Sequence, residues 1–271
     1  MYRMLCAASM LIVAAFPAVA QTAGSAGPVS PEIVKDLAPT GKLRAAINLG
    51  NAILAQGSAQ EPRGITVDLA RELARRTGLA LELVTFEAAG KVFEALKAGA
   101  WDIAFIAIEP VRAAEIDFSP PYVFIEGTYM VPKDSPLKEI ADVDRPGVRI
   151  AVGRGSAYDL FLTRTIKHAT VVRAHIGGGR AMIDLFVAEK LEAVAGVKQS
   201  LIDYARTDAS VRVMDGRFMV IEQAMGTPKG RVAAARYVRG FVEEMKASGF
   251  VAEALRRSNQ PSAQVAPPAL N

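Results

Sequence analysis

The stretch 102–122 constrains the fold more than any other part of this chain. It begins with an apolar run, 103–108, whose length and composition are typical of a strand buried on both faces of a parallel sheet. Glu109 and Pro110 then end the strand, because proline suits the first position of a helix. Arg112 follows in the first helical turn, at the sheet edge where open parallel sheets bind ligands. Its fork of N–H donors fits a carboxylate or phosphate, although an exposed arginine on an ordinary helix is an equally simple interpretation.

The chain before this stretch alternates between strand and helix patterns. Strands are predicted at 43–49 and 81–86, and helices at 67–77 and 91–97. Together with the run 103–108, this βαβαβ order predicts one lobe of an α/β protein.

A second α/β unit begins after residue 147. A strand at 148–152 leads into the loop Gly-Arg-Gly-Ser at 153–156 and then into a helix, so backbone N–H groups and a helix N-terminus face an anion site. Further strands are predicted at 171–176 and 192–197. The three glycines 177–179 form either an anion-binding nest or a tight turn between strand and helix.

The stretch 102–122 resembles a motif of the bacterial periplasmic solute-binding proteins that serve polar amino-acid transporters. That family shows a strand, then Thr-x-Thr-Pro-Glu-Arg, then Phe-Ser-x-Pro-Tyr; here the corresponding residues read Ala-Ile-Glu-Pro-Val-Arg at 107–112 and Phe-Ser-Pro-Pro-Tyr at 118–122. The arginine, the first proline and the second block match, but both threonine positions differ. The resemblance covers roughly residues 41–258.

The resemblance implies a two-lobed periplasmic-binding-protein fold of type II, with two crossover strands as the hinge. Lobe 1 would comprise residues 41–126 and 222–258, and lobe 2 would comprise residues 127–221. It also implies a monomer that binds a small ligand in the cleft and delivers it to the permease of an ABC importer.

The two ends of the chain are expected to lie outside the lobes. Residues 1–20 read as a cleaved signal peptide, with a positive start, an apolar core and an Ala-x-Ala site, which predicts a periplasmic protein. Residues 21–40 are expected to be a flexible leader with a short helix near 31–37, and residues 259–271 a disordered tail.

Composition argues against several classes of function. The net charge of +4 over 271 residues is spread along the chain and gives little support for a nucleic-acid partner. The single cysteine, Cys6, lies in the signal peptide, so we expect no thiol chemistry. The two histidines, His168 and His175, do not have metal-ligand spacing, and no P-loop or nucleophile elbow occurs. We expect no metal and no cofactor.

The candidate ligand-binding residues lie at the carboxyl ends of predicted strands or in the helix starts that follow. They are Asn48, Asn51, Phe105, Ala107, Glu109, Arg112, Tyr122, Ser156, Ala157 and Tyr158. By the resemblance, Arg112 and Ser156 form a carboxylate clamp. The aromatic position of the family falls at Asn51, and the aspartate that binds a ligand's ammonium group falls at Val197. Because Val197 cannot pair with a cation, the ligand is expected to be a small organic anion without a strictly required ammonium group.

Glu109 has two possible roles at this point. It either caps the helix that begins at Pro110 or faces the ligand near Arg112. Some relatives are dehydratases that act on cyclohexadienyl carboxylates, so an enzyme with Glu109 as general acid is the alternative to a transport protein.

Overall fold

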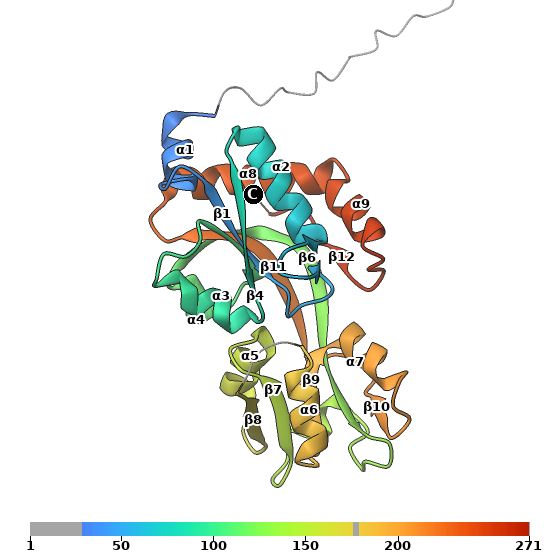
Figure 1. The fold of residues 1–271 in the computed structure, drawn as a ribbon. Helices are drawn as coiled ribbons and strands as arrows, with labels where there is room; N and C mark the ends of the chain where they lie inside the picture. The colour runs from blue at the N-terminus through green and yellow to red at the C-terminus, as the bar shows by residue number, and fades with distance from the viewer. Residues whose placement is uncertain (1–28, 176–178, 271) are drawn as a thin grey trace, which may run out of the picture.

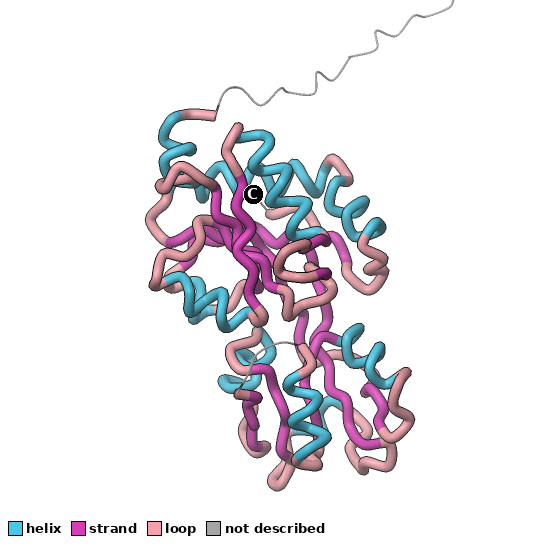
Figure 2. The backbone as a smooth tube through the Cα atoms, in the orientation of Figure 1, coloured by secondary structure: helices cyan, strands magenta, loops and turns pink. Residues whose placement is uncertain are grey.

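The computed structural model describes residues 29–175 and 179–270, so the predicted signal peptide lies outside the described residues. Within these ranges, ten strands form one sheet in the order β4-β1-β5-β11-β6-β9-β7-β8, with β10 and β12 paired to β6. The sheet runs through two lobes that lie one above the other, joined by β6 and β11 (Figures 1 and 2). This is the predicted type II arrangement, and the α/β fold class is confirmed.

The upper lobe in Figure 1 contains three parallel strands, β1 (Leu43–Asn48), β4 (Leu81–Phe86) and β5 (Ile103–Ala107). The helices of this lobe are α1 (Pro31–Leu37), α2 (Ile65–Thr77), α3 (Ala89–Leu96), α4 (Pro110–Ala113), α8 (Val232–Ala247) and α9 (Phe250–Arg257). A small two-stranded sheet joins β2 (Gln56–Gly57) and β3 (Pro62–Arg63).

The lower lobe is built on the parallel strands β7 (Arg149–Gly153), β8 (Thr170–Ala174) and β9 (Ala193–Val197), with β10 (Val211–Val213) against β6. Its helices are α5 (Ala157–Thr165), α6 (Ala181–Ala188), α7 (Lys198–Ala205) and the 3-10 turn η1 (Ile140–Val143).

Two long strands connect the lobes. In β6 (Ile116–Pro132), residues 116–127 pair with β11 (Met219–Pro228), and residues 127–130 pair with β9 of the lower lobe. The two strands are antiparallel and lie side by side in the middle of the sheet, so both connections between lobes pass through one narrow region. Such a pair of extended segments suits a hinge.

Strand β5 forms because its residues are apolar and it lies centrally in the sheet. All five residues, Ile-Ala-Phe-Ile-Ala, are buried, with β1 on one side and β11 on the other.

Helix α2 begins after Gly64 and ends at Gly78, whose φ of 68° is in the left-handed region that a C-terminal glycine adopts readily. Helices α3 and α4 lie on the side of the upper lobe that is nearest the lower lobe (Figure 1).

Both expected termini differ from the prediction in part. The short helix predicted near 31–37 is found as α1, but it packs on α8 with Leu37 fully buried and so does not belong to a flexible leader. The Asp36 carboxylate accepts hydrogen bonds from the first N–H groups of α8, which fixes α1 to the lobe.

The predicted disordered tail is wrong for residues 259–270. Strand β12 (Gln264–Val265) pairs with β6, and Ala263 and Ala266 are buried. A two-residue strand has no periodicity, so the sequence pattern could not indicate it.

Candidate functional site

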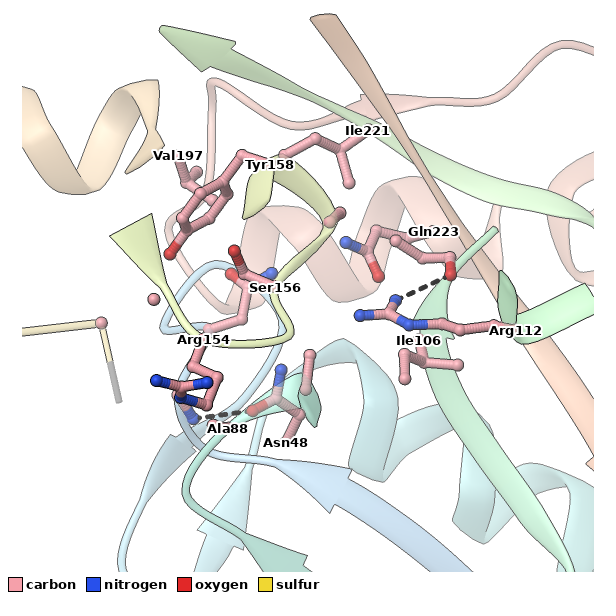
Figure 3. A pocket seen from close by; sticks show the side chains of 17 residues that line it. Asn48, Ala88, Ile106, Arg112, Arg154, Ser156, Tyr158, Val197, Ile221 and Gln223 are labelled. Atoms are coloured by element: carbon pink, nitrogen blue, oxygen red, sulfur yellow. Dashed lines mark hydrogen bonds between the residues drawn. The ribbon is translucent and has the colours of Figure 1, made fainter. Parts of the chain in front are cut away.

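A cavity of about 70 Å³ lies between the two lobes, where the strand ends of both face each other (Figure 3). It is the kind of concave site at a strand edge that α/β proteins use for small ligands. The lining residues from the upper lobe and β11 are Asn48, Gly50, Asn51, Ala88, Ala89, Ile106, Ala107, Arg112, Ile221 and Gln223. Those from the lower lobe are Gly153, Arg154, Ser156, Ala157, Tyr158, Gly179 and Val197.

Arg112 belongs to the upper lobe, on the short helix α4, and its side chain is fully buried. Its Nη1 donates to the carbonyl of Ala107 at 2.9 Å, and its Nη2 donates across the cleft to the carbonyl of Gly155 at 2.8 Å. Its Nε is buried without a partner among the described residues. Burial lowers the pKa of Arg112 to about 10, against the opposing effect of nearby Glu109, so the side chain is cationic at neutral pH.

Ser156 places the N-terminus of α5 at the lower side of the cavity. Its Oγ accepts a hydrogen bond from the N–H of Asp159 at 3.0 Å, which caps the helix. The first N–H groups, those of Ala157 and Tyr158, have no acceptor within a helix and lie at the cavity wall. The Asp159 carboxylate binds the N–H of Gly155 at 2.7 Å and the side chain of Arg173 at 2.9 Å, which holds the loop in place.

Asn48, the last residue of β1, and Asn51, in the loop after it, have side-chain oxygens that already accept a backbone hydrogen bond. The Oδ1 of Asn48 accepts from the N–H of Gly50 at 3.0 Å, and the Oδ1 of Asn51 accepts from the N–H of Ile53 at 3.2 Å. Because a backbone N–H requires an oxygen acceptor, these bonds fix which end of each amide is free. The Nδ2 groups remain to donate to a ligand.

The lobes touch through glycines beside the cavity. A Cβ added to Gly155 would lie 2.9 Å from the Cα of Gly90, and one added to Gly179 would lie 3.0 Å from the carbonyl oxygen of Gly50. A side chain at Gly155 is also disfavoured by its φ of 68°. At Gly155 only glycine allows this approach, and the two lobes are in contact beside the cavity.

Glu109 occupies the predicted N-cap position of α4, but its side chain takes neither predicted role. Its side chain makes no helix-capping hydrogen bond and does not line the cavity. Instead it forms an ion pair of 2.5 Å with Arg164 of α5, across the cleft. Glu109 is 3% exposed, whereas Arg164 is 42% exposed. The partner is 55 residues away in the chain, so no local pattern could identify it.

Phe105 and Tyr122 were also predicted at the site, and the structure places both in the core of the upper lobe. Their rings meet edge to face with centroids 6.3 Å apart. Ile106 and Ala107, the last two residues of β5, line the cavity, whereas Phe105 lies one residue further from the strand end and packs in the core. All of β5 is buried, so its apolar pattern could not separate these positions.

The other predicted residues all line the cavity: Asn48, Asn51, Ala107, Arg112, Ser156, Ala157 and Tyr158. The hydroxyl of Tyr158 donates to the Sδ of Met182 at 2.9 Å, and burial raises its pKa to about 12, so it remains protonated. Val197, predicted where relatives carry an aspartate, also lines the cavity.

Several residues that line the cavity were not predicted from the sequence. Gln223 lies on β11, 5% exposed and next to Arg112 in Figure 3, and its position follows only from the antiparallel pairing of Gln223 with Ala107. Arg154 belongs to the predicted glycine loop but carried no separate signal. Ala88 and Ala89 bring the N-terminus of α3 to the wall, opposite that of α5.

The electrostatic character of the cavity is positive. Among the described residues that line it, Arg112 and Arg154 are cationic and none is acidic. Two helix N-termini add partial positive charge. In the part of the chain that the structure describes, no group of three or more histidine, cysteine, aspartate or glutamate side chains could hold a metal ion.

Comparison with solved structures shows the same fold. The solute receptor for L-cysteine of Neisseria gonorrhoeae is 21% identical, with a TM-score of 0.72 over 84% of this chain and 94% of that one. An amino acid ABC transporter substrate-binding protein from Streptococcus pneumoniae, bound to L-arginine, is 20% identical, with a TM-score of 0.69 over 86% and 99%. An ancestral amino acid-binding protein, a precursor of cyclohexadienyl dehydratase, is 21% identical, with a TM-score of 0.68 over 83% and 97%.

No curated protein sequence matches the chain. Of the helices that the structure describes, none has the length and apolar character needed to cross a membrane. A family model matches residues 52–259, which span the lower lobe and most of the upper lobe. The chain belongs to the bacterial extracellular solute-binding proteins, family 3.

Proposed function

We propose that this protein is the periplasmic solute-binding component of an ABC importer and that its ligand is a small organic anion. The observation that carries the proposal is the charge of the cavity: two arginines and two helix N-termini line it, with no carboxylate among the described lining residues. A buried anion needs such compensation, whereas a buried cation would be destabilised there.

Arg112 is the central group of the proposed site. Its Nη atoms already bind Ala107 in one lobe and Gly155 in the other, and its Nε still lacks a partner among the described residues. A ligand carboxylate beside Arg112 would pair with the charge of a guanidinium that already joins the two lobes. The anion would then favour the closed form over an open one.

An α-ammonium group has no evident partner in the cavity. The solved relatives include an L-cysteine receptor and an L-arginine-bound protein. In this chain Val197 stands where the family resemblance implies an aspartate, and Glu109 is bound to Arg164. The ligand is therefore a carboxylate that does not depend on an ammonium group for recognition.

The proposed mechanism is hinge closure of a monomer about β6 and β11. Small-angle scattering with and without ligand tests it directly. The radius of gyration is expected to fall when ligand is added, because closure brings the lobes together. Identical profiles at saturating ligand would contradict the hinge.

Replacement of Arg112 tests the ligand proposal. Arg112→Ala should weaken binding of the preferred organic acid by about 2–5 kcal/mol, because one partner of a buried charge-assisted contact is removed. Arg154→Ala is the matched comparison, since Arg154 lines the same cavity but is exposed, and it should cost less. Calorimetry that gives unchanged affinity for Arg112→Ala would disprove the proposal.

The dehydratase alternative needs a general acid at the ligand. The candidate acid, Glu109, points to Arg164 and does not line the cavity. A turnover assay with cyclohexadienyl carboxylates separates the two functions, and catalysis abolished by Glu109→Gln would favour the enzyme.

A further inference from the structure

The polar groups around the cavity are almost all hydrogen-bond donors. The oxygen of each lining asparagine is already bound to a backbone N–H, which leaves the Nδ2 atoms of Asn48 and Asn51 facing the ligand. The Oγ of Ser156 accepts from the N–H of Asp159, and its hydroxyl is also a donor. Arg112, Arg154 and the helix N-termini supply further donors and have no acceptor.

Side-chain acceptors are correspondingly scarce. Among the described lining residues, the side-chain oxygen of Gln223 makes no hydrogen bond within the protein and could accept from a ligand, and the hydroxyl oxygen of Tyr158, whose hydrogen goes to Met182, is a second acceptor. A donor on the ligand would otherwise meet donors of the protein and lose its hydrogen bonds to water. Ligand oxygens that only accept match this environment, since an unmatched buried polar group costs free energy.

The volume of the cavity limits the length of the ligand. The cavity has a volume of about 70 Å³, so it admits only a small ligand. Ile106, Val197 and Ile221 lie on its wall and restrict extension. A short acid should therefore fit better than one with a long aliphatic chain.

We propose that the site selects short-chain acids whose second functional group is also an acceptor, either an oxo group or a second carboxylate. This inference rests on the proposed function and narrows it. A 2-oxo acid or a short dicarboxylate presents only acceptors to the donors of Asn48, Asn51, Ser156 and Arg112. The corresponding 2-hydroxy acid adds one donor, and the 2-amino acid adds a cation with three.

Pyruvate, lactate and alanine test the inference because they have the same number of non-hydrogen atoms and differ at one group. Calorimetry on the full mature chain should rank pyruvate above lactate and lactate above alanine, with at least about tenfold between pyruvate and alanine. Malonate distinguishes a second carboxylate from an oxo group, and 2-oxooctanoate tests the size limit and should bind more weakly than pyruvate.

A substitution that changes a donor into an acceptor gives an independent test. Asn48→Asp keeps the oxygen that binds Gly50 and replaces the free amide nitrogen with an anionic oxygen. The ratio of pyruvate to alanine affinity should fall by about tenfold or more, because the new charge repels the acid's second acceptor and attracts the ammonium. Asn259→Asp, the same change at a residue that does not line the cavity, should leave the ratio unchanged. Thermal unfolding without ligand checks that each variant is folded, and Asn51→Asp replaces Asn48→Asp if the latter is not.

The possible results separate the two proposals. Tightest binding by lactate or alanine, or an affinity ratio unaffected by Asn48→Asp and Asn51→Asp, overturns the inference about acceptors while leaving an anion-binding protein. Binding of no acid in the panel overturns the proposed function as well. Tighter binding of 2-oxooctanoate than of pyruvate overturns the size limit.

Discussion

Two buried carboxylates in the upper lobe are each paired with arginine, but they belong to different parts of the molecule. Asp102 lies inside the lobe, fully buried, and binds Arg44 at 2.8 Å and Arg231 at 2.8 Å. Glu109 lies at the cleft and binds Arg164 of the opposite lobe at 2.5 Å. Both are carboxylate–arginine pairs. Asp102 joins β1 to the segment before α8 within one lobe, whereas Glu109 joins the two lobes.

The difference determines which equilibrium each pair affects. If a partner of Asp102 is removed, the carboxylate stays buried as long as the lobe is folded, so the cost falls on folding. If Arg164 is removed, opening of the cleft can return Glu109 to water. The cost then falls on closure and hence on ligand affinity.

Replacement of Asp102 should have the largest effect on stability. Asp102→Asn should lower the free energy of unfolding by about 3 kcal/mol, because Arg44 and Arg231 lose a buried ionic partner. Urea denaturation without ligand measures this loss. Glu82→Gln is the control, since Glu82 forms an exposed pair of 3.7 Å with Lys42, and it should change stability by less than about 1 kcal/mol. Equal effects of the two substitutions would remove the distinction between buried and exposed pairs.

The stability that Asp102 supplies should also depend on pH. Burial alone would raise the pKa of Asp102, but hydrogen bonds from Arg44 and Arg231 outweigh it and hold the pKa below the usual 3.8. Such a group stabilises the fold above its unfolded pKa, and this contribution is lost as the pH falls through the lower folded pKa. The difference in unfolding free energy between wild type and Asp102→Asn should therefore shrink as the pH is lowered below about 4. A difference that stays constant down to pH 2 would contradict the linkage.

Local sequence patterns predict the strands of this protein and part of its candidate site. Strands such as β4 and β5 follow from local apolar patterns, and Arg112 and Ser156 follow from their positions after strands. The core position of Phe105 does not, because all five residues of β5 are buried and their pattern does not separate core from cavity.

Contacts between distant segments are the part that sequence could not supply. The pairing of Glu109 with Arg164 and the position of Gln223 depend on how the lobes and β11 come together. The closed approach of Gly90 to Gly155 is of the same kind, since each glycine alone indicates only a turn or a helix start.

The cleft pair should affect binding and leave folding almost unchanged. Glu109→Gln, Arg164→Gln and the double variant form a double-mutant cycle on the affinity for the preferred acid. A coupling of about 1 kcal/mol is expected, or roughly fivefold in Kd, because Arg164 is partly exposed. The unfolding free energies without ligand should agree within about 0.5 kcal/mol. Coupling that appears in unfolding but not in binding would show that the pair belongs to the folded core.

A change in ionic strength should give the smallest effect. It distinguishes the Glu109–Arg164 pair from the Asp102 group and uses only the variants already described. Raising the ionic strength from about 0.1 to about 1 M shortens the Debye length from about 10 to about 3 Å, which screens the 42% exposed Arg164 more than the buried Asp102 group. The binding cycle for Glu109 and Arg164 cancels the direct effect of salt on the charged ligand, because that effect is common to all four proteins. Its coupling should fall by roughly half, whereas the stability loss of Asp102→Asn should persist. If the Asp102→Asn difference disappears at high salt while the cleft coupling remains, the assignment of the two pairs to folding and to closure must be reversed.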